Sequence, residues 1–202
     1  MRRGFKAEAE RHAASLRASI DCSDRESPNL AKIAVHLRVA VLPADQLLDG
    51  GIDDLLALHQ AQAGAFSAAT LSPPGKRRVV VYNPVNFEGR YLTPAEAKLD
   101  GRTRSNVAHE FSHMILGHEV RQVQKITEHY FFTCNPEQEE EANWLAGAIL
   151  LPRPLLIDAA RHGLTDAQTA TMHNVTAEMA RFRMNTSGAK MQVARARKSR
   201  SA

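Results

Sequence analysis

Apolar residues recur along this chain with two different periods. Steps of three and four residues are typical of amphipathic helices, and they predict helices at residues 5–20, 30–37, 52–62, 102–116, 154–162, 166–173 and 177–184. Short apolar runs predict strands at residues 39–42, 65–71 and 77–82. The chain is therefore expected to be α+β, mostly helical, with a small sheet of about three strands.

Turn and capping residues set the boundaries of several elements. Residues 72–75 (Ser-Pro-Pro-Gly) separate the last two strands and predict a hairpin. Gly117 is expected to end the helix at 102–116 as its C′ residue. A further helix is expected to begin at Asn135, the N-cap, with Pro136 and Gln138 behind it, and to stop at Pro152.

Length and composition favour a single domain followed by a short tail. The chain has 202 residues, of which 44% are hydrophobic, which is ordinary for a folded protein. We assign residues 1–188 to one domain. Residues 189–202 contain five basic and no acidic residues, and we expect this tail to be disordered. A basic tail can also contact nucleic acid through phosphates, but we do not expect nucleic acid to be a direct ligand.

The distribution of apolar residues and cysteines favours a cytoplasmic location. The N-terminal segment is charged and has no apolar leader, so a secretory signal is not expected. The apolar runs, such as residues 146–151, are far shorter than the roughly 20 residues of a membrane span. The two cysteines, Cys22 and Cys134, are far apart and do not indicate a disulfide framework.

The strongest chemical motif is His109-Glu110-Phe111-Ser112-His113, an HExxH pattern within a predicted helix. Residues four apart lie one above the other on a helix, so both imidazoles can face one zinc ion. Glu110 lies about 100° around the helix and can act as general base toward a water molecule.

The surroundings of this motif favour a metal site over a chance pair of surface histidines. Val107, Ala108, Phe111, Met114 and Ile115 form an apolar stripe on the same helix. The centre of this stripe lies nearly opposite the two histidines, so the helix can bury one side and turn the histidines toward a cleft.

A catalytic zinc needs a third protein ligand, and the helix that begins at Asn135 offers four glutamates. Glu141 and Glu139 flank its apolar stripe on opposite sides, Glu137 lies one turn below Glu141, and Glu140 points away. Acidic residues at a helix N-terminus also complement the helix dipole, and this is the better interpretation of Glu137, Glu139 and Glu140. Periodicity narrows the choice but leaves it open.

Two segments resemble the ImmA/IrrE family of metallo-endopeptidases. They run from Val107 to His118 (VAHEFSHMILGH) and from Glu141 to Pro152 (EANWLAGAILLP). Residues 4–10, 81–84 and 175–184 carry a weaker similarity, so that the resemblance covers most of residues 4–190.

The resemblance implies a zincin-like domain in which His109, His113 and Glu141 hold one zinc ion per chain. It also implies a regulatory protease whose substrates are helix-turn-helix transcriptional repressors of mobile elements or stress genes. Two departures are Ser112, where many members have Gly, and the spacing before His118. Thermolysin-like enzymes have an Asp four residues after the ligand glutamate, and with Glu141 as ligand that position is Leu145.

Four other residues are weaker candidates for the site. Tyr130 or His118 could line the cleft or stabilise an oxyanion; a structural tyrosine and a histidine favoured by the helix dipole are the plainer interpretations. Val81 and Asn83 could belong to a strand edge that binds substrate backbone.

The prediction that follows is a zinc-dependent endopeptidase that cleaves a transcriptional repressor, with Glu110 as general base. Two alternatives stay open. One is a catalytically inactive, metal-bearing module that sequesters a regulator. The other is a DNA-binding regulator that uses the C-terminal helices and the basic tail.

Overall fold

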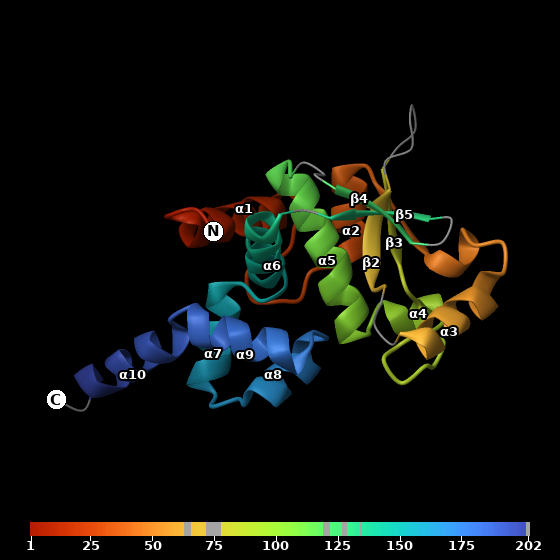
Figure 1. The fold of residues 1–202 in the computed structure, drawn as a ribbon. Coiled ribbons are helices and arrows are strands. Elements are labelled where there is room, and N and C mark those ends of the chain that lie inside the picture. The colour runs from red at the N-terminus through yellow and green to blue at the C-terminus, as the bar shows by residue number, and fades with distance from the viewer. Residues whose placement is uncertain (63–65, 72–77, 119–121, 127–128, 134, 201–202) are drawn as a thin grey trace.

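A computed structural model describes residues 1–62, 66–71, 78–118, 122–126, 129–133 and 135–200 of the chain (Figure 1). Its helices are α1 (Phe5–Ser19), α2 (Leu30–Leu37), η1 (Ala44–Gln46), α3 (Gly51–Ala61), α4 (Pro94–Ala97), α5 (Gly101–Leu116), α6 (Pro136–Leu150), α7 (Arg153–Arg161), α8 (Asp166–His173), α9 (Ala177–Thr186) and α10 (Ala189–Arg200). Its strands are β1 (Ala40–Pro43), β2 (Ala68–Leu71), β3 (Val79–Tyr82), β4 (Gln122–Ile126) and β5 (His129–Thr133). The α+β class, mostly helical with a small sheet of three strands, is confirmed.

The three-stranded sheet has the order β1-β3-β2. Strands β2 and β3 are antiparallel, with Thr70 opposite Val80, as the expected hairpin requires; its turn at 72–75 lies outside the described residues. Strand β1 runs parallel to β3, with Val41 opposite Val80. Val80 is fully buried because β3 is the central strand and one face of the sheet packs on helices.

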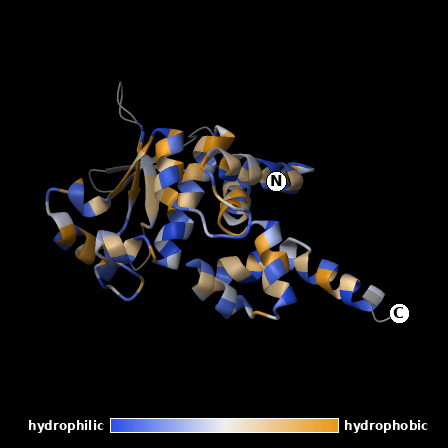
Figure 2. Cartoon of the chain, turned by 180° about the vertical axis from the view of Figure 1, so that it is seen from behind, coloured by the Kyte–Doolittle hydropathy of each residue, from blue (hydrophilic) through white to orange (hydrophobic). Residues whose placement is uncertain are grey.

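Helices α1, α5 and α6 form the main helical layer beside this sheet (Figure 1). Their apolar faces meet in one cluster, in which Phe5, Phe111, Leu145 and Ile149 are completely buried. Burial of each such side chain contributes on the order of 1.5–3 kcal/mol. Figure 2 shows hydrophobic and hydrophilic residues on different faces of the same helices. The amphipathic pattern of the sequence therefore determines which face of each helix is buried.

The last four helices pack around the C-terminal end of α6. Leu150, Leu156, Ala180 and Met184 belong to their shared apolar cluster. The structure differs from the prediction of a disordered tail, because residues 189–200 form α10, whose Ala189 and Val193 are buried. Small apolar residues spaced four apart are enough to dock this basic helix on its neighbours, α7 and α9.

Two further elements correct or complete the sequence-based picture. Strands β4 and β5 pair antiparallel in the segment of the chain that connects α5 to α6, where no strands were expected. The short helix α4 begins after Thr93, and a capping box between Thr93 and Glu96 stabilises its N-terminus. Within the described residues, no helix is both long and apolar enough to cross a membrane.

Candidate metal centre

Helix α5 carries the HExxH motif and is held at both ends by its caps. The Asp100 carboxylate accepts a hydrogen bond from the Thr103 amide, and Gly117 closes the helix with φ of 63°. Ser112, where the resemblance expects a glycine, is fully buried and donates to the Ala108 carbonyl at 2.8 Å. This departure from the family pattern therefore fits within the helix packing.

His109 and His113 point to the same place, as their spacing of four residues predicts. Their Nε2 atoms lie 2.9 Å apart. The Glu139 carboxylate from α6 joins them, with Oε2 3.1 Å from Nε2 of His109 and Oε1 3.6 Å from Nε2 of His113. One ligand atom from each of the three residues lies within 4.8 Å of the others.

Glu141 is not beside this histidine pair, contrary to the expectation from the resemblance. Its Oε1 accepts hydrogen bonds from Nε and from the backbone amide of Arg2, at 3.0 and 3.2 Å. Its Oε2 lies 3.5 Å from Nε2 of His118. Two residues along a helix correspond to a rotation of about 200°, so Glu139 and Glu141 cannot face the same point.

Each histidine of the pair is also contacted at its other ring nitrogen. Nδ1 of His109 lies 2.9 Å from Oδ1 of Asn143, and Nδ1 of His113 lies 2.9 Å from Nδ1 of His118. Asn143 is four residues after Glu139, on the same side of α6. Thermolysin-like enzymes have an Asp four residues after the ligand glutamate, and Leu145 holds that position after Glu141. After Glu139 the same position is Asn143, an amide that contacts His109.

The electrostatics of the cluster favour a protonated His109 and an ionised Glu139. Burial lowers the pKa of His109, but the hydrogen bond that the imidazole donates to Glu139 and the negative charges of Glu110 and Glu139 outweigh burial and raise this pKa overall. Hydrogen bonds from His109 and His113 hold the pKa of Glu139 far below its usual range. An ionised Glu139 is the state in which a carboxylate ligates a metal.

Glu110 is anchored by the sheet rather than by its own helix. The Thr70 hydroxyl in β2 donates to Oε2 of Glu110 at 2.7 Å. The structure therefore brings a strand residue, which the sequence did not single out, into contact with the residue expected to act as base. This contact joins segments 40 residues apart, and no local pattern could have indicated it.

Our prediction of an exposed strand edge at Val81 is wrong. Strand β3 is paired on both sides, and Val81 is 5% exposed. Asn83 is also committed elsewhere, because its side chain donates to the Phe66 carbonyl and accepts from the Val85 amide. The edge strand next to α5 is β2. Tyr130 is in β5, and its side chain lies outside the described part of the structure.

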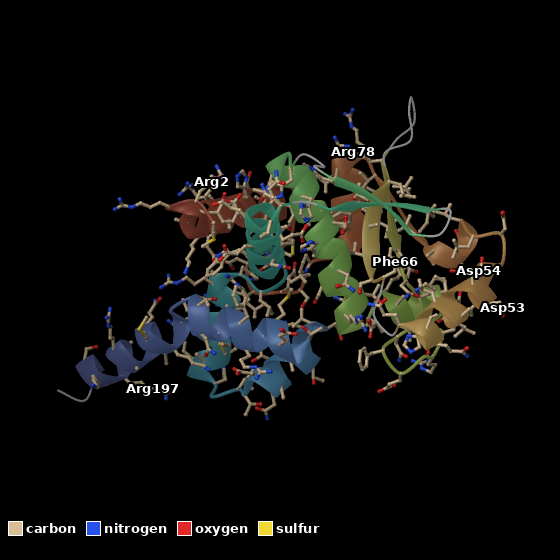
Figure 3. All side chains as sticks on the ribbon, in the orientation of Figure 1. Arg2, Asp53, Asp54, Phe66, Arg78 and Arg197 are labelled. Carbon is tan, nitrogen blue, oxygen red and sulfur yellow. The ribbon has the colours of Figure 1, made fainter. Side chains whose placement is uncertain are left out.

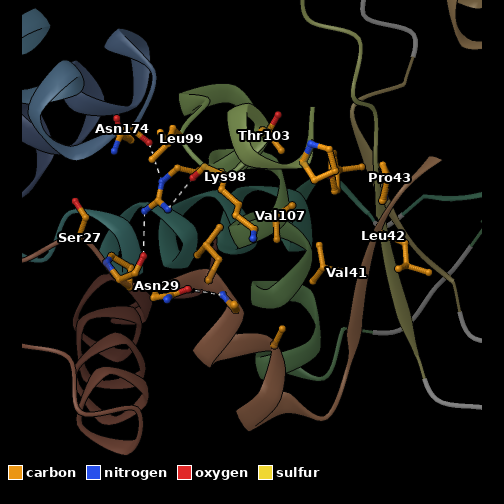
Figure 4. A pocket seen from close by; sticks show the side chains of 18 of the residues that line it. Ser27, Asn29, Val41, Leu42, Pro43, Lys98, Leu99, Thr103, Val107 and Asn174 are labelled. Atoms are coloured by element: carbon orange, nitrogen blue, oxygen red, sulfur yellow. Dashed lines mark hydrogen bonds between the residues drawn. The ribbon is translucent and has the colours of Figure 1, made fainter. Parts of the chain in front are cut away.

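A cavity of about 750 Å³ lies on another face of α5, between this helix, α2, β1 and α4 (Figure 4). Thr103, Arg104 and Val107 line it from α5, whereas the histidines and Glu110 do not. The Arg104 guanidinium donates to the carbonyls of Pro28 and Asn174, both at 3.0 Å. These bonds tie α5 to the loop before α2 and to the end of α8.

The donor set at His109, His113 and Glu139 matches the chemistry of a catalytic zinc site. Two imidazole nitrogens and one carboxylate are a common ligand set for such sites, which leave a fourth position for water. The side chains are 20%, 12% and 42% exposed, respectively, so the cluster is accessible from solvent on the Glu139 side. The residues present therefore fit a metal ion.

One comparison with known proteins identifies a family for this chain. A family model described as the IrrE N-terminal-like domain, Peptidase_M78, matches residues 66–185. That range contains α5 and α6, which supply His109, His113 and Glu139, and β2, which supplies Thr70. No curated protein and no solved structure matches the chain.

Proposed function

The chain belongs to the Peptidase_M78 family of IrrE N-terminal-like domains, and on this basis we propose that it is a zinc-dependent endopeptidase. The observation that carries the proposal is the convergence of His109, His113 and Glu139, with Glu110 next to His109 on the same helix. Membership of the family supports a protease in general terms. The zinc ion, the third ligand and cleavage at internal peptide bonds are our proposals.

His109, His113 and Glu139 would hold the zinc ion through two Nε2 atoms and a carboxylate oxygen. Zinc in such a site lowers the pKa of water and polarises a carbonyl as a Lewis acid. Glu139 replaces Glu141 in this assignment because only the former reaches both histidines.

Glu110 is proposed to take up the proton of the attacking water and to deliver it to the leaving amine. Thr70 occupies one carboxylate oxygen of Glu110, which leaves the other oxygen to exchange the proton. Because Thr70 belongs to β2, the base is fixed relative to the sheet as well as to α5.

The substrate backbone is proposed to pair with β2, the edge strand beside α5. This replaces the edge at Val81. The resemblance supports a helix-turn-helix repressor as the protein that is cleaved. Incubation with a panel of purified repressors, with casein as a general substrate, tests this class: mass spectrometry should find one cleaved bond in a repressor and intact casein.

The first test of the metal centre is zinc stoichiometry at saturating zinc. We expect about one zinc per chain in the wild type and in Glu141→Ala, and a loss in Glu139→Ala. Loss in Glu141→Ala with retention in Glu139→Ala would reject our ligand assignment.

The first test of the reaction is Glu110→Gln. This variant should keep its zinc and lose cleavage by at least about 100-fold, since a general base contributes roughly 10²–10⁴-fold. Cleavage at the wild-type rate would reject the role of Glu110. If Glu110→Gln also kept full activity in cells, the protein would act by binding rather than by hydrolysis.

A further inference from the structure

A row of buried polar side chains leads away from His113 on the side opposite Glu139. Nδ1 of His113 lies 2.9 Å from Nδ1 of His118, and Nε2 of His118 lies 3.5 Å from Oε2 of Glu141. The side chains of His118 and Glu141 are only 6% and 5% exposed. Polar groups buried to this extent cost free energy unless they are paired, so their alignment calls for an explanation.

One arrangement of protons is consistent with the contacts in this row. If Nε2 of His113 faces the metal, its Nδ1 carries the proton and donates to Nδ1 of His118. A neutral His118 then carries its own proton on Nε2, which faces the Glu141 carboxylate. The His113 donor therefore meets an acceptor, and this bond holds His113 in the tautomer whose Nε2 can ligate. Nε2 of His118 makes no hydrogen bond within the described residues, and at 3.5 Å its attraction to the Glu141 carboxylate is electrostatic.

Arg2 fixes the far end of the row. Its Nε and its backbone amide both donate to Oε1 of Glu141, so the carboxylate is held on the side of α6 away from Glu139. Figure 3 shows Arg2 near the N-terminal end of α6, where α1 and α6 pack together. The position of Glu141 is therefore set by tertiary contacts and not by the metal-binding cluster.

We propose that His118 and Glu141 are positioning residues for the metal centre: His118 fixes the ring orientation and tautomer of His113, and Glu141 fixes His118. Asn143 does the same for His109 from the other side. This inference rests on the proposed zinc site, but it concerns residues that do not touch the metal. It also gives Glu141 a role that differs from the ligand role implied by the resemblance.

The measurement is metal affinity, determined by competition with a chelator for zinc and by the visible absorption of bound cobalt(II). His118→Phe keeps a ring of similar size but removes both nitrogens, and should weaken affinity about 10–100-fold. His118→Asn restores an acceptor near the position of Nδ1 and should recover most of the loss. The cobalt spectrum should change in His118→Phe, because the ligand geometry of His113 changes.

Glu141→Ala should weaken affinity in the same direction, whereas Glu140→Ala, its exposed neighbour on α6, should not. Because Glu141 acts through His118, the double variant His118→Phe/Glu141→Ala should bind no more weakly than His118→Phe alone. If His118→Phe does not fold, the double variant His118→Asn/Glu141→Ala is compared with His118→Asn alone, and it should bind zinc no more weakly.

Two outcomes would overturn this inference while the proposed function stands. The first is a wild-type affinity and cobalt spectrum in His118→Phe, even if its melting temperature falls, since His118 would then be structural. The second is additive losses in the double variant, which would separate Glu141 from His118. A wild-type protein that binds neither zinc nor cobalt would instead overturn the proposed function and this inference together.

Discussion

The Thr70 hydroxyl links the sheet to Glu110, the proposed base, through one hydrogen bond of 2.7 Å. A hydroxyl donor to a carboxylate restricts the carboxylate to one orientation. At the scale of single residues, this contact and those of Glu139, Asn143 and His118 decide what the helices can do chemically. None of these four partners is adjacent in sequence to the side chain that it orients.

We therefore expect Thr70→Val to lower kcat by about 10-fold with little change in KM, because valine keeps the shape of threonine and removes the donor. Thr70→Ser keeps the hydroxyl and serves as the matched control, which should stay close to the wild type. Peptidase kinetics on a cleavable reporter would measure both. An equal loss in Thr70→Ser would mean that packing, and not the hydroxyl, matters at this position.

Glu96 gives a residue-scale prediction about pH. Hydrogen bonds from Arg90 and Thr93 lower its pKa from 4.5 to about 2. Because the pKa is depressed in the folded state, its contribution to stability is present above pH 4.5 and is lost as the pH falls toward 2. NMR titration of the Glu96 carboxyl should give a midpoint near 2, and Arg90→Ala should raise it. A midpoint near 4.5 in the wild type would contradict these hydrogen bonds.

At the scale of elements, the orientation of α5 depends on how closely it approaches the C-terminal helices. A Cβ atom at Gly101, the first residue of α5, would come within 2.6 Å of the Val175 carbonyl carbon. Val175 lies between α8 and α9, so this close backbone contact seats α5 on the turn that joins them. The same helix is held from another side by Arg104, whose guanidinium reaches three backbone carbonyls.

Gly101→Ala should therefore destabilise the protein by about 1–3 kcal/mol, since backbone atoms cannot move aside as a flexible side chain can. Chemical denaturation would measure the change. In a helix without this contact, the same substitution would raise stability by up to about 1 kcal/mol. A more stable Gly101→Ala variant would thus contradict the close packing of α5 on the α8–α9 turn.

At the scale of the whole molecule, the proposed metal site joins two helices that have no local connection. His109 and His113 come from α5 and Glu139 from α6, with β4 and β5 between them in sequence. A ligand that binds only the folded state stabilises the whole domain, by about 2.7 kcal/mol at a concentration 100 times its dissociation constant.

Zinc at 100 times its dissociation constant should therefore raise the melting temperature by about 5–10 °C relative to protein in EDTA, given about 2–4 °C per kcal/mol for a domain of this size. Differential scanning fluorimetry would measure this shift. Glu139→Ala should show little or no shift and is the matched control. An equal shift in Glu139→Ala would place the stabilising zinc elsewhere on the chain.

The sequence by itself determined many of the elements, though not β4, β5 or α10, and the first half of the proposed site. Local periodicity and capping residues predicted α5, α6 and the paired strands β2 and β3 because these features act within a few residues of one another. The HExxH spacing placed His109 and His113 on one side of a helix for the same reason.

Only the tertiary structure showed that Glu139, and not Glu141, lies beside the histidine pair. Both lie near the N-terminus of α6, and the choice depends on how α6 is rotated against α5 and on where Arg2 of the N-terminal segment lies. Asn143 lies four residues after Glu139 and therefore on the same side of α6. Only the contact of Asn143 with His109 shows that this side faces the histidines. The edge position of β2 and the docking of α10 were likewise beyond local patterns, because strand order and helix packing are set by contacts between distant parts of the chain.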